Sequence, residues 1–349
     1  MEFQPLPLDL VASLPELPFP VYLRRDGRMI LYAMPGADLG AALGRTKAGL
    51  QVHVPSDDAG AMRRLLVLLL ARSLGSRSEP IADRGRRATA LAMALLGPLF
   101  GPERSLDAEA YVAGQAAVDL ISEALAREPA LGRAVVGGHP PPAPAVEPDA
   151  ADGAFGASAG ARQIASHALD GLACAILVAG MLARDGAALD STTMLELGRG
   201  VAFRDVGLSR APAVGALRRL RPVRMGATAN ADHPALGVRL LGDALGWQPA
   251  WISLVAGHHE RLDGSGYPTG RRGGDLPRAT RVAGLADTFA ALIAPAAWGR
   301  VRAAEEAIGV LRLGARARFG DDLVWALVRV LDAGHLLPAH RTSRGALTH

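Results

Sequence analysis

The chain has little lysine, cysteine or aromatic side chain. Lys47 is the only lysine among 38 basic residues, so nearly all the positive charge is arginine, and it is scattered among 34 acidic residues. No basic cluster with interleaved aromatics is present, which argues against a nucleic-acid-binding surface, although a net charge of +4 suits an anionic ligand. Because Cys174 is alone, the sequence excludes a disulfide framework and a thiolate metal site.

Long hydrophobic runs are also missing. The longest apolar stretches, Leu65–Ala71 and Gly171–Ala183, are shorter than the roughly 20 residues that a membrane span requires. The start of the chain, Met1–Pro5, lacks a basic region followed by an apolar run. We therefore expect a soluble protein in the cytoplasm. Hydrophobic residues make up 50% of the 349 residues, which is enough for a sizeable core and predicts two domains.

Residues 1–55 contain short strand patterns. Phe19–Leu23 leads through a turn signal at Arg24–Gly27 into Met29–Tyr32, and Leu50–Val54 is a third candidate strand. The sequence therefore predicts a small β-rich N-terminal module over residues 1–55.

Residues 56–136 are rich in alanine, leucine and arginine and poor in β-branched side chains, which favours helices. The expected helices are Ala59–Leu74, Ile81–Leu99 and Ala108–Arg127. We interpret this region as a helical connector that packs and dimerises. The alternative is a signal-receiving surface.

Residues 137–160 break the helical pattern with proline, alanine and glycine, which predicts a linker and a domain boundary. Helical periodicity returns over residues 161–335, beginning with a helix over Ser166–Ala183, and residues 336–349 are expected to form a flexible tail. The predicted fold class is mainly α, with an all-α C-terminal bundle preceded by a small α+β N-terminal module.

The most distinctive stretch of the sequence begins with two adjacent histidines, His258 and His259, and ends at Pro268. Adjacent side chains on a helix point about 100° apart, so the pair can share one metal after slight bending or bind one metal each. Imidazole is the commonest protein ligand for borderline transition metals. Gly264 and Gly266 permit a sharp turn and a close approach to a ligand, and the proline stops a following helix.

Further candidate ligands follow one another along residues 161–335. Taken singly, each has an ordinary explanation, such as a helix cap or a surface turn. Together with the paired histidines they make six histidine or aspartate positions, which are residue types that serve as metal ligands. The additional residues are His167, Asp205, His233 and Asp287.

These ligands and the run Gly266-Tyr267-Pro268 resemble the HD-GYP family, helical metal-dependent phosphohydrolases that cleave the bacterial second messenger cyclic di-GMP. The resemblance implies an all-α HD-type bundle that binds two or three iron or manganese ions, whose charge assists attack on a phosphodiester. Linear pGpG or GMP would be the product. Position by position it implies metal ligands at His167, Asp205, His233, His258, His259 and Asp287, with catalytic roles for Asp205, His258 and His259.

The resemblance also implies a ligand-binding loop. In the family the Gly-Tyr-Pro tyrosine, Tyr267 here, forms a lip over the substrate, and family members meet diguanylate cyclase domains through that lip. The expected ligand-binding positions are Arg204, Arg261, Asp263, Gly264, Gly266, Tyr267, Pro268 and Arg300.

Four positions depart from the family pattern. Arg204 stands where the histidine of the His-Asp pair is expected, and a guanidinium cannot act as a metal ligand. Leu208 replaces a lysine, and Gln163 replaces a glutamate that often serves a third metal. Ala296–Gly299 occupies the place of an Arg-Pro-Tyr element that holds the ligand's phosphates, which leaves Arg300 nearby.

Three interpretations stay open. The chain is a slow cyclic-di-GMP phosphodiesterase with a reduced metal set, an inactive HD-GYP module that binds cyclic di-GMP or docks partners such as diguanylate cyclases, or a metal phosphohydrolase for a smaller phosphoester. We favour a phosphodiesterase-type domain with a degraded site. One hypothesis is that Arg204 substitutes for metal charge by pairing directly with a ligand phosphate.

Overall fold

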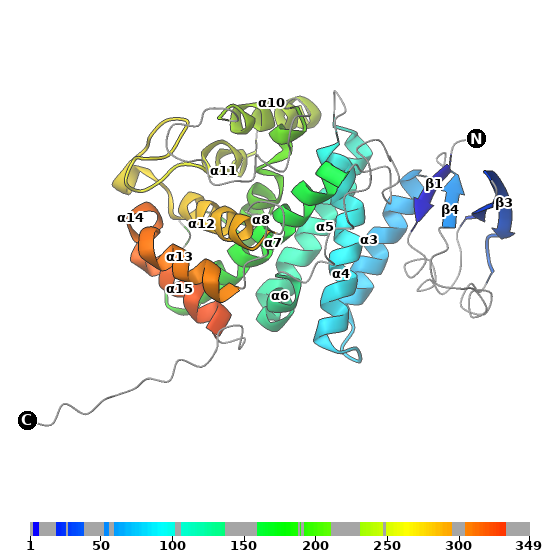
Figure 1. Cartoon of the computed structure of the whole chain (residues 1–349), viewed down its shortest axis with the longest axis horizontal. Helices are drawn as coiled ribbons and strands as arrows, with labels where there is room; N and C mark the ends of the chain where they lie inside the picture. Colours follow the sequence, from blue (N-terminus) through cyan, green and yellow to red (C-terminus); the bar gives the residue numbers. More distant parts are fainter. Residues whose placement is uncertain are drawn as a thin grey trace, which may run out of the picture.

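The chain is mainly helical, with a small sheet at its N-terminal end (Figure 1), which confirms the predicted fold class. The computed structural model describes residues 3–6, 19–25, 27–37, 52–55, 59–101, 106–136, 159–187, 189, 192–210, 231–246, 249–294 and 304–332.

The sheet is antiparallel and has the strand order β1-β4-β2-β3. Three strands overlap the predicted ones. The sequence does not predict the first strand, because its Pro5 cannot donate to a ladder and such residues disfavour a strand assignment. The strands are β1 (Phe3–Leu6), β2 (Val21–Arg25), β3 (Arg28–Ala33) and β4 (Val52–Pro55).

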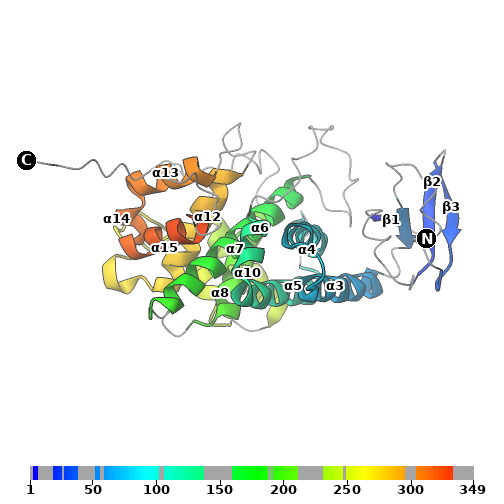
Figure 2. The ribbon, with the colours of Figure 1, turned by 90° about the horizontal axis from the view of Figure 1, so that it is seen from below.

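Beyond the sheet the predicted connector is helical. Its helices lie between the sheet and the C-terminal helices in both views (Figures 1 and 2). The predicted third helix is confirmed at both ends, and Asp107 caps it by accepting hydrogen bonds from the amides of Glu109 and Ala110. The elements are α3 (Ala59–Gly75), α4 (Ile81–Leu96), the 3₁₀ turn η2 (Gly97–Phe100), α5 (Ala108–Arg127) and α6 (Pro129–Val135).

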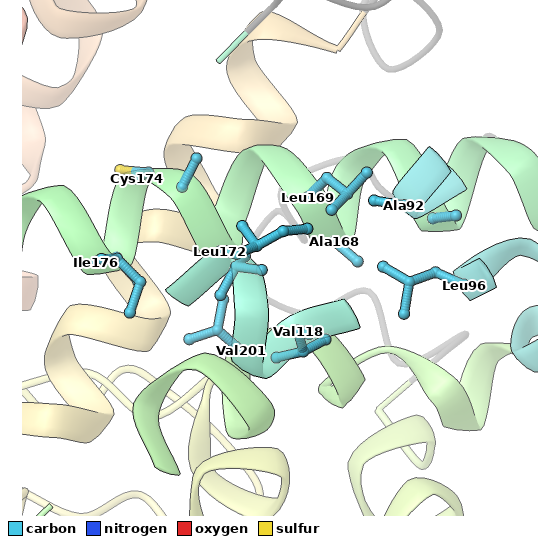
Figure 3. Packing of buried hydrophobic residues seen from close by; sticks show 14 of the residues in the cluster. Ala92, Leu96, Val118, Ala168, Leu169, Leu172, Cys174, Ile176 and Val201 are labelled. Atoms are coloured by element: carbon cyan, nitrogen blue, oxygen red, sulfur yellow. The ribbon is translucent and has the colours of Figure 1, made fainter. Parts of the chain in front are cut away.

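The centre of the molecule is α7 (Ala159–Arg184), which packs on helices before and after it in the sequence. It begins before the predicted helix over Ser166–Ala183, so the predicted start is wrong and His167 lies inside the helix. Figure 3 shows Leu169 and Leu172 of α7 close to Val118 of α5 and to Val201, which belongs to a later helix. The predicted connector and C-terminal bundle therefore share one hydrophobic core.

The division of the chain into connector, linker and C-terminal domain stays a prediction. Residues 137–158 of the proposed linker and residues 336–349 of the proposed tail lie outside the described part of the chain.

In the described residues, one segment is long and apolar enough to cross a membrane by length and composition alone. This segment, Gly160–Arg184, has a mean hydropathy of 1.6 in its most apolar window, and 83% of that window is buried inside the protein. This segment is longer than the apolar stretch Gly171–Ala183 recognised in the sequence and includes polar residues such as His167 and Asp170. Its burial identifies it as the core helix of the bundle.

The remaining helices surround one face of α7, and α12 packs along it most extensively (Figure 1). They are α8 (Met194–Phe203), η4 (Val206–Arg210), α10 (His233–Leu245), α11 (Ile252–Gly257), η5 (Gly273–Asp275), α12 (Arg278–Ile293), α13 (Ala304–Gly314), α14 (Arg316–Phe319) and α15 (Asp321–Asp332).

Two local features position the junction between α8 and η4. Helix α8 starts with a capping box, in which the Thr193 hydroxyl accepts from the Glu196 amide at 3.1 Å and the Glu196 carboxylate accepts from the Thr193 amide at 2.8 Å. In η4, a Cβ on Gly207 would lie 2.0 Å from the His233 carbonyl oxygen, so glycine permits η4 to contact the start of α10. Arg204 and Asp205 are thereby fixed between α8 and α10.

Removing the Thr193 cap should destabilise the protein without changing its fold. We expect Thr193→Ala to lower the free energy of unfolding by about 1 kcal/mol, because the Glu196 amide loses its acceptor. Urea denaturation measures the loss, and Thr193→Ser, which keeps the hydroxyl, should retain most of the stability. Equal losses in the two variants would contradict the capping role.

Candidate metal centre

All six predicted metal ligands come together in the interior. They are supplied by α7, the junction between α8 and η4, the first residue of α10, the end of α11, and α12. Two groups of three have ligand atoms that lie within 4.8 Å of one another, and either group could hold a metal ion. The groups are His233, His258 and His259, and His167, Asp205 and Asp287.

The three histidines of the first group point their Nε2 atoms at a common position. His233 Nε2 lies 3.1 Å from His258 Nε2 and 3.3 Å from His259 Nε2. Asp205 Oδ1 lies 3.4 Å from His233 Nε2 and 3.8 Å from His258 Nε2. A tetrahedral ion with bonds of about 2.0–2.1 Å places its ligands roughly 3.3 Å apart, so the three histidines suit one ion and Asp205 Oδ1, 3.8 Å from His258 Nε2, would complete the set after a small shift.

The protonation of His258 suits this role. Its Nδ1 lies 2.8 Å from the Val255 carbonyl oxygen, which can only accept, so Nδ1 carries the proton and Nε2 presents a lone pair to the site. Burial, followed by the neighbouring His233, lowers the pKa of His258 to about 4. Burial and the neighbouring His258 also hold the pKa of His259 well below its usual value. Both rings are therefore neutral at neutral pH, as a metal ligand requires.

In the second group, the guanidinium of Arg204 lies beside both aspartates. His167 Nε2 lies 2.9 Å from Asp287 Oδ1 and 3.5 Å from Asp205 Oδ2. Arg204 Nε reaches the same two oxygens, at 2.9 Å from Asp287 Oδ1 and 3.2 Å from Asp205 Oδ2. The carboxylate oxygens that face His167 are therefore also the counter-ions of Arg204.

Arg204 also controls the ionisation of both carboxylates. Burial alone would raise the pKa of Asp205 and of Asp287, because it penalises the charged form. The Arg204 charge, with hydrogen bonds from His233 to Asp205 and from His167 to Asp287, holds both pKa values below the usual range. Both aspartates are thus ionised at neutral pH.

The placement of Arg204 does not support its predicted direct contact with a ligand phosphate. Its side chain is fully buried, Nη1 donates to the Val201 carbonyl at 2.6 Å, and Nη2 donates to the His167 carbonyl at 3.2 Å. With Nε on Asp287, every nitrogen of the guanidinium already donates to the protein. The charge of Arg204 therefore acts through the two aspartates.

Sequence reasoning missed Gly171, which makes room for this arginine. A Cβ at this position of α7 would lie 2.7 Å from Arg204 Nη1 and 2.9 Å from Nη2. A glycine inside a long helix is a recognisable signal of close packing, but it does not say which side chain approaches.

The Gly-Tyr-Pro loop lies directly on the histidine group. The ring of Tyr267 stacks on His259, with centroids 4.6 Å apart and an interplanar angle of 19°. A Cβ on Gly266 would lie 2.4 Å from the His259 carbonyl oxygen, so glycine permits the chain to fold back here. Pro268 follows at the surface. The predicted lip is therefore adjacent to a predicted metal ligand.

Three other predicted ligand-binding residues shape this loop. Arg261 donates to the carbonyls of His258 and Glu260 and lies over the ring of Phe319. Asp263 accepts from the amide and hydroxyl of Ser265, and Gly264 has a φ of 76° beside Arg272. Arg261 thus links the end of α11 to α14 and also lies beside Gly284 of α12, whereas the contact of Asp263 with Ser265 lies within the loop.

The positions that depart from the family pattern are only partly described. Leu208 is buried in η4, and Gln163 lies one turn before His167 on α7. The predicted ligand-binding residue Arg300 and the segment Ala296–Gly299 lie outside the described residues.

Glu260 is a second residue whose role the sequence hides. Although it follows two histidines, its buried carboxylate turns into the loop and accepts from the Thr269 amide at 2.6 Å, the Thr269 hydroxyl at 2.6 Å and the Arg271 amide at 3.1 Å. Glu260 therefore braces the loop. No sequence signal distinguishes this role from metal ligation.

The fold and this site define the chain as an HD-domain protein. Residues 228–323 match the HD domain family. The solved structure of Bd1817, a HDG"Y"P protein from Bdellovibrio bacteriovorus, superposes with a TM-score of 0.62 at 17% identity, and covers 95% of this chain and 100% of that one, which shows a common fold.

Two curated proteins are similar in sequence to part of the chain. The chain is 39% identical over 75 residues to a probable cyclic di-GMP phosphodiesterase of Vibrio cholerae serotype O1, which is 22% of this chain and 17% of that protein. It is 35% identical over 101 residues to the cyclic di-GMP phosphodiesterase response regulator RpfG of Xanthomonas campestris pv. campestris, which is 28% of this chain and 26% of that protein. The chain thus spans about a quarter or less of these relatives. Together with the motifs of the chain, these partial matches support an HD-GYP family member.

Acid should destabilise the metal-free protein through His258. The folded pKa of about 4 lies below the roughly 6.5 of an unfolded histidine, so between these values only the unfolded chain binds the proton. Stability therefore falls as the pH drops through this window. We expect a loss of roughly 2 kcal/mol between about pH 7 and about pH 5, measured by urea unfolding.

The variant His258→Gln is the matched control for this pH effect, because an amide does not titrate in the same range. Between about pH 7 and about pH 5, this variant should lose roughly 2 kcal/mol less stability than the unmodified protein. An identical loss in both proteins would assign the acid sensitivity to other groups.

Replacing Glu260 should loosen the loop and leave the core unchanged. Glu260→Ala leaves the Thr269 and Arg271 donors without their acceptor, so we expect faster amide hydrogen exchange over residues 264–271. Glu260→Gln keeps one acceptor oxygen and should give an intermediate rate. Unchanged exchange in both variants would show that the loop does not depend on this carboxylate.

Proposed function

We propose that this chain is an HD-GYP-type metal-dependent phosphodiesterase domain in cyclic-di-GMP signalling, which hydrolyses cyclic di-GMP to linear pGpG or GMP. The observation that carries the proposal is the convergence of four histidines and two aspartates beside the Gly-Tyr-Pro loop. The names of the two curated relatives support the same substrate. Iron or manganese is the proposed ion, and the cytoplasm is the proposed location.

The chemistry follows from the residues that would hold the ion. A divalent cation supplies positive charge that polarises a phosphoryl oxygen and makes water a better nucleophile. His233, His258 and His259 would hold it with Asp205. The hydrogen bond of His258 to the Val255 carbonyl fixes the orientation of His258 before substrate binds. The contact of Asp205 with Arg204 fixes the orientation of Asp205 in the same way.

The Gly-Tyr-Pro loop supplies the proposed contact with substrate. Tyr267 presents a flat ring beside His259, where a guanine base or a phosphate edge would approach. The Tyr267 hydroxyl is buried without a hydrogen-bond partner among the described residues, which leaves a polar group available to a ligand. The Glu260 brace holds this ring in place.

The alternative is an inactive HD-GYP module that binds cyclic di-GMP or docks partners such as diguanylate cyclase domains. A specific observation favours it, because Arg204 replaces a ligand position and pairs with both aspartates. Dimerisation through the connector helices stays a prediction. No observation favours a smaller phosphoester as the substrate.

An activity assay separates these proposals. Protein loaded anaerobically with Fe²⁺ or Mn²⁺ and incubated with cyclic di-GMP should release pGpG or GMP, detected by chromatography. His258→Ala should reduce turnover by more than about 100-fold, because it removes a ligand and leaves its partners unpaired.

The outcomes that decide between the alternatives are distinct. Saturable binding of cyclic di-GMP without product, measured by calorimetry, would establish the inactive module. Hydrolysis of bis(p-nitrophenyl) phosphate without hydrolysis or binding of cyclic di-GMP would contradict the proposed substrate.

A further inference from the structure

We infer that the metal centre of this chain holds a single ion, bound by His233, His258, His259 and Asp205, and that the Arg204 guanidinium occupies the place of a second ion between Asp205 and Asp287. The inference rests on the proposed function only in treating the site as a metal site. The inferred number of ions, one, differs from the two or three that the family resemblance implies.

The two oxygens of Asp205 divide the centre into two halves. Oδ1 faces the histidine group, at 3.4 Å from His233 Nε2 and 3.8 Å from His258 Nε2. Oδ2 faces the other way, at 3.2 Å from Arg204 Nε and 3.5 Å from His167 Nε2. Asp205 would thus bridge a metal ion on one side and a guanidinium on the other.

The histidine half has the donors that one ion needs. Three separations between its ligand atoms, 3.1, 3.3 and 3.4 Å, are close to the roughly 3.3 Å of a tetrahedral ion, and the fourth, 3.8 Å between His258 Nε2 and Asp205 Oδ1, would shorten on binding. Without an ion, the one proton on His233 Nε2 faces three acceptors, Asp205 Oδ1 and the Nε2 atoms of His258 and His259, and His258 Nε2 has no proton to donate because Nδ1 carries it. The geometry therefore points to a cation between these atoms.

The other half already contains its cation. Arg204 Nε and His167 Nε2 both lie 2.9 Å from the same oxygen, Asp287 Oδ1. A second ion at this oxygen would have to displace a fully buried guanidinium from two carboxylates and from the carbonyls of Val201 and His167. An arginine does not lose its proton, so it would remain as a buried, unpaired charge, which is strongly unfavourable.

The backbone is shaped to accept the guanidinium. The absent Cβ of Gly171 leaves space that three atoms of the Arg204 guanidinium fill, at 2.7, 2.9 and 3.0 Å from where a Cβ would lie. These contacts are closer than a side chain at residue 171 would allow. Arg204 is therefore accommodated by its surroundings, and its position is an organised part of the centre.

Metal analysis of the full chain tests the inference. After anaerobic loading with Mn²⁺ and removal of excess ion, elemental analysis should give one equivalent per chain. His258→Ala should lose that equivalent, because it removes a ligand of the occupied half. His167→Ala should retain it, because His167 belongs to the half that the guanidinium occupies.

Electron paramagnetic resonance provides a second readout. The spectrum should be that of isolated Mn²⁺, without exchange coupling between neighbouring ions. Arg204→His should raise the content from one to two equivalents and introduce coupling, since an imidazole can act as a ligand where a guanidinium cannot. If Arg204→His does not fold, the comparison of His167→Ala with His258→Ala still shows which half of the centre holds the ion.

Several results would overturn the inference. Two equivalents or none in the unmodified protein would contradict it, as would loss of the ion in His167→Ala. Its failure is distinguishable from failure of the proposed function. One bound ion without hydrolysis of cyclic di-GMP would contradict the proposed phosphodiesterase activity and support the single-ion centre. Two bound ions with hydrolysis would support the phosphodiesterase activity and contradict the single-ion centre.

Discussion

The buried contact of Arg204 with Asp205 and Asp287 is the interaction on which the centre of this molecule depends. Taking three charges out of water is costly, and the mutual attraction offsets that cost only when the remaining polar atoms are satisfied. Here two backbone carbonyls accept from the guanidinium, and His167 contacts Asp287. The contact also joins the end of α8 to α12 across α7, so the same atoms organise both the core and the site.

This arrangement explains why the sequence could predict the members of the site but not their roles. The order of histidines and aspartates and the Gly-Tyr-Pro run were sufficient to predict which residues converge, because together they resemble the pattern of a known family. Arg204 was visible in the sequence as a departure from the family pattern, but the direction in which its side chain points was not. Whether a guanidinium meets solvent, a ligand or a carboxylate depends on α7 and α12, which are distant in sequence.

The fold was predicted with similar limits. The helices of the connector followed from alanine-rich and leucine-rich periodicity, whereas the Asp107 cap of α5 was recognised only in the structure. The first strand escaped notice because Pro5 masks its pairing with β4. The role of Glu260 was likewise hidden, because its acceptor contacts involve backbone amides nine and eleven residues further along the chain, which only the turn at Gly264 brings near.

The guanidinium has a consequence for how the protein is assembled in the cell. Two ionised carboxylates in a buried cavity repel each other, and a site that relied on metal alone would carry that repulsion until an ion arrived. Arg204 comes with the chain and balances one of the charges from the moment α7, α8 and α12 meet. The charge balance of the core therefore does not depend on a metal ion, and the chain can fold without one.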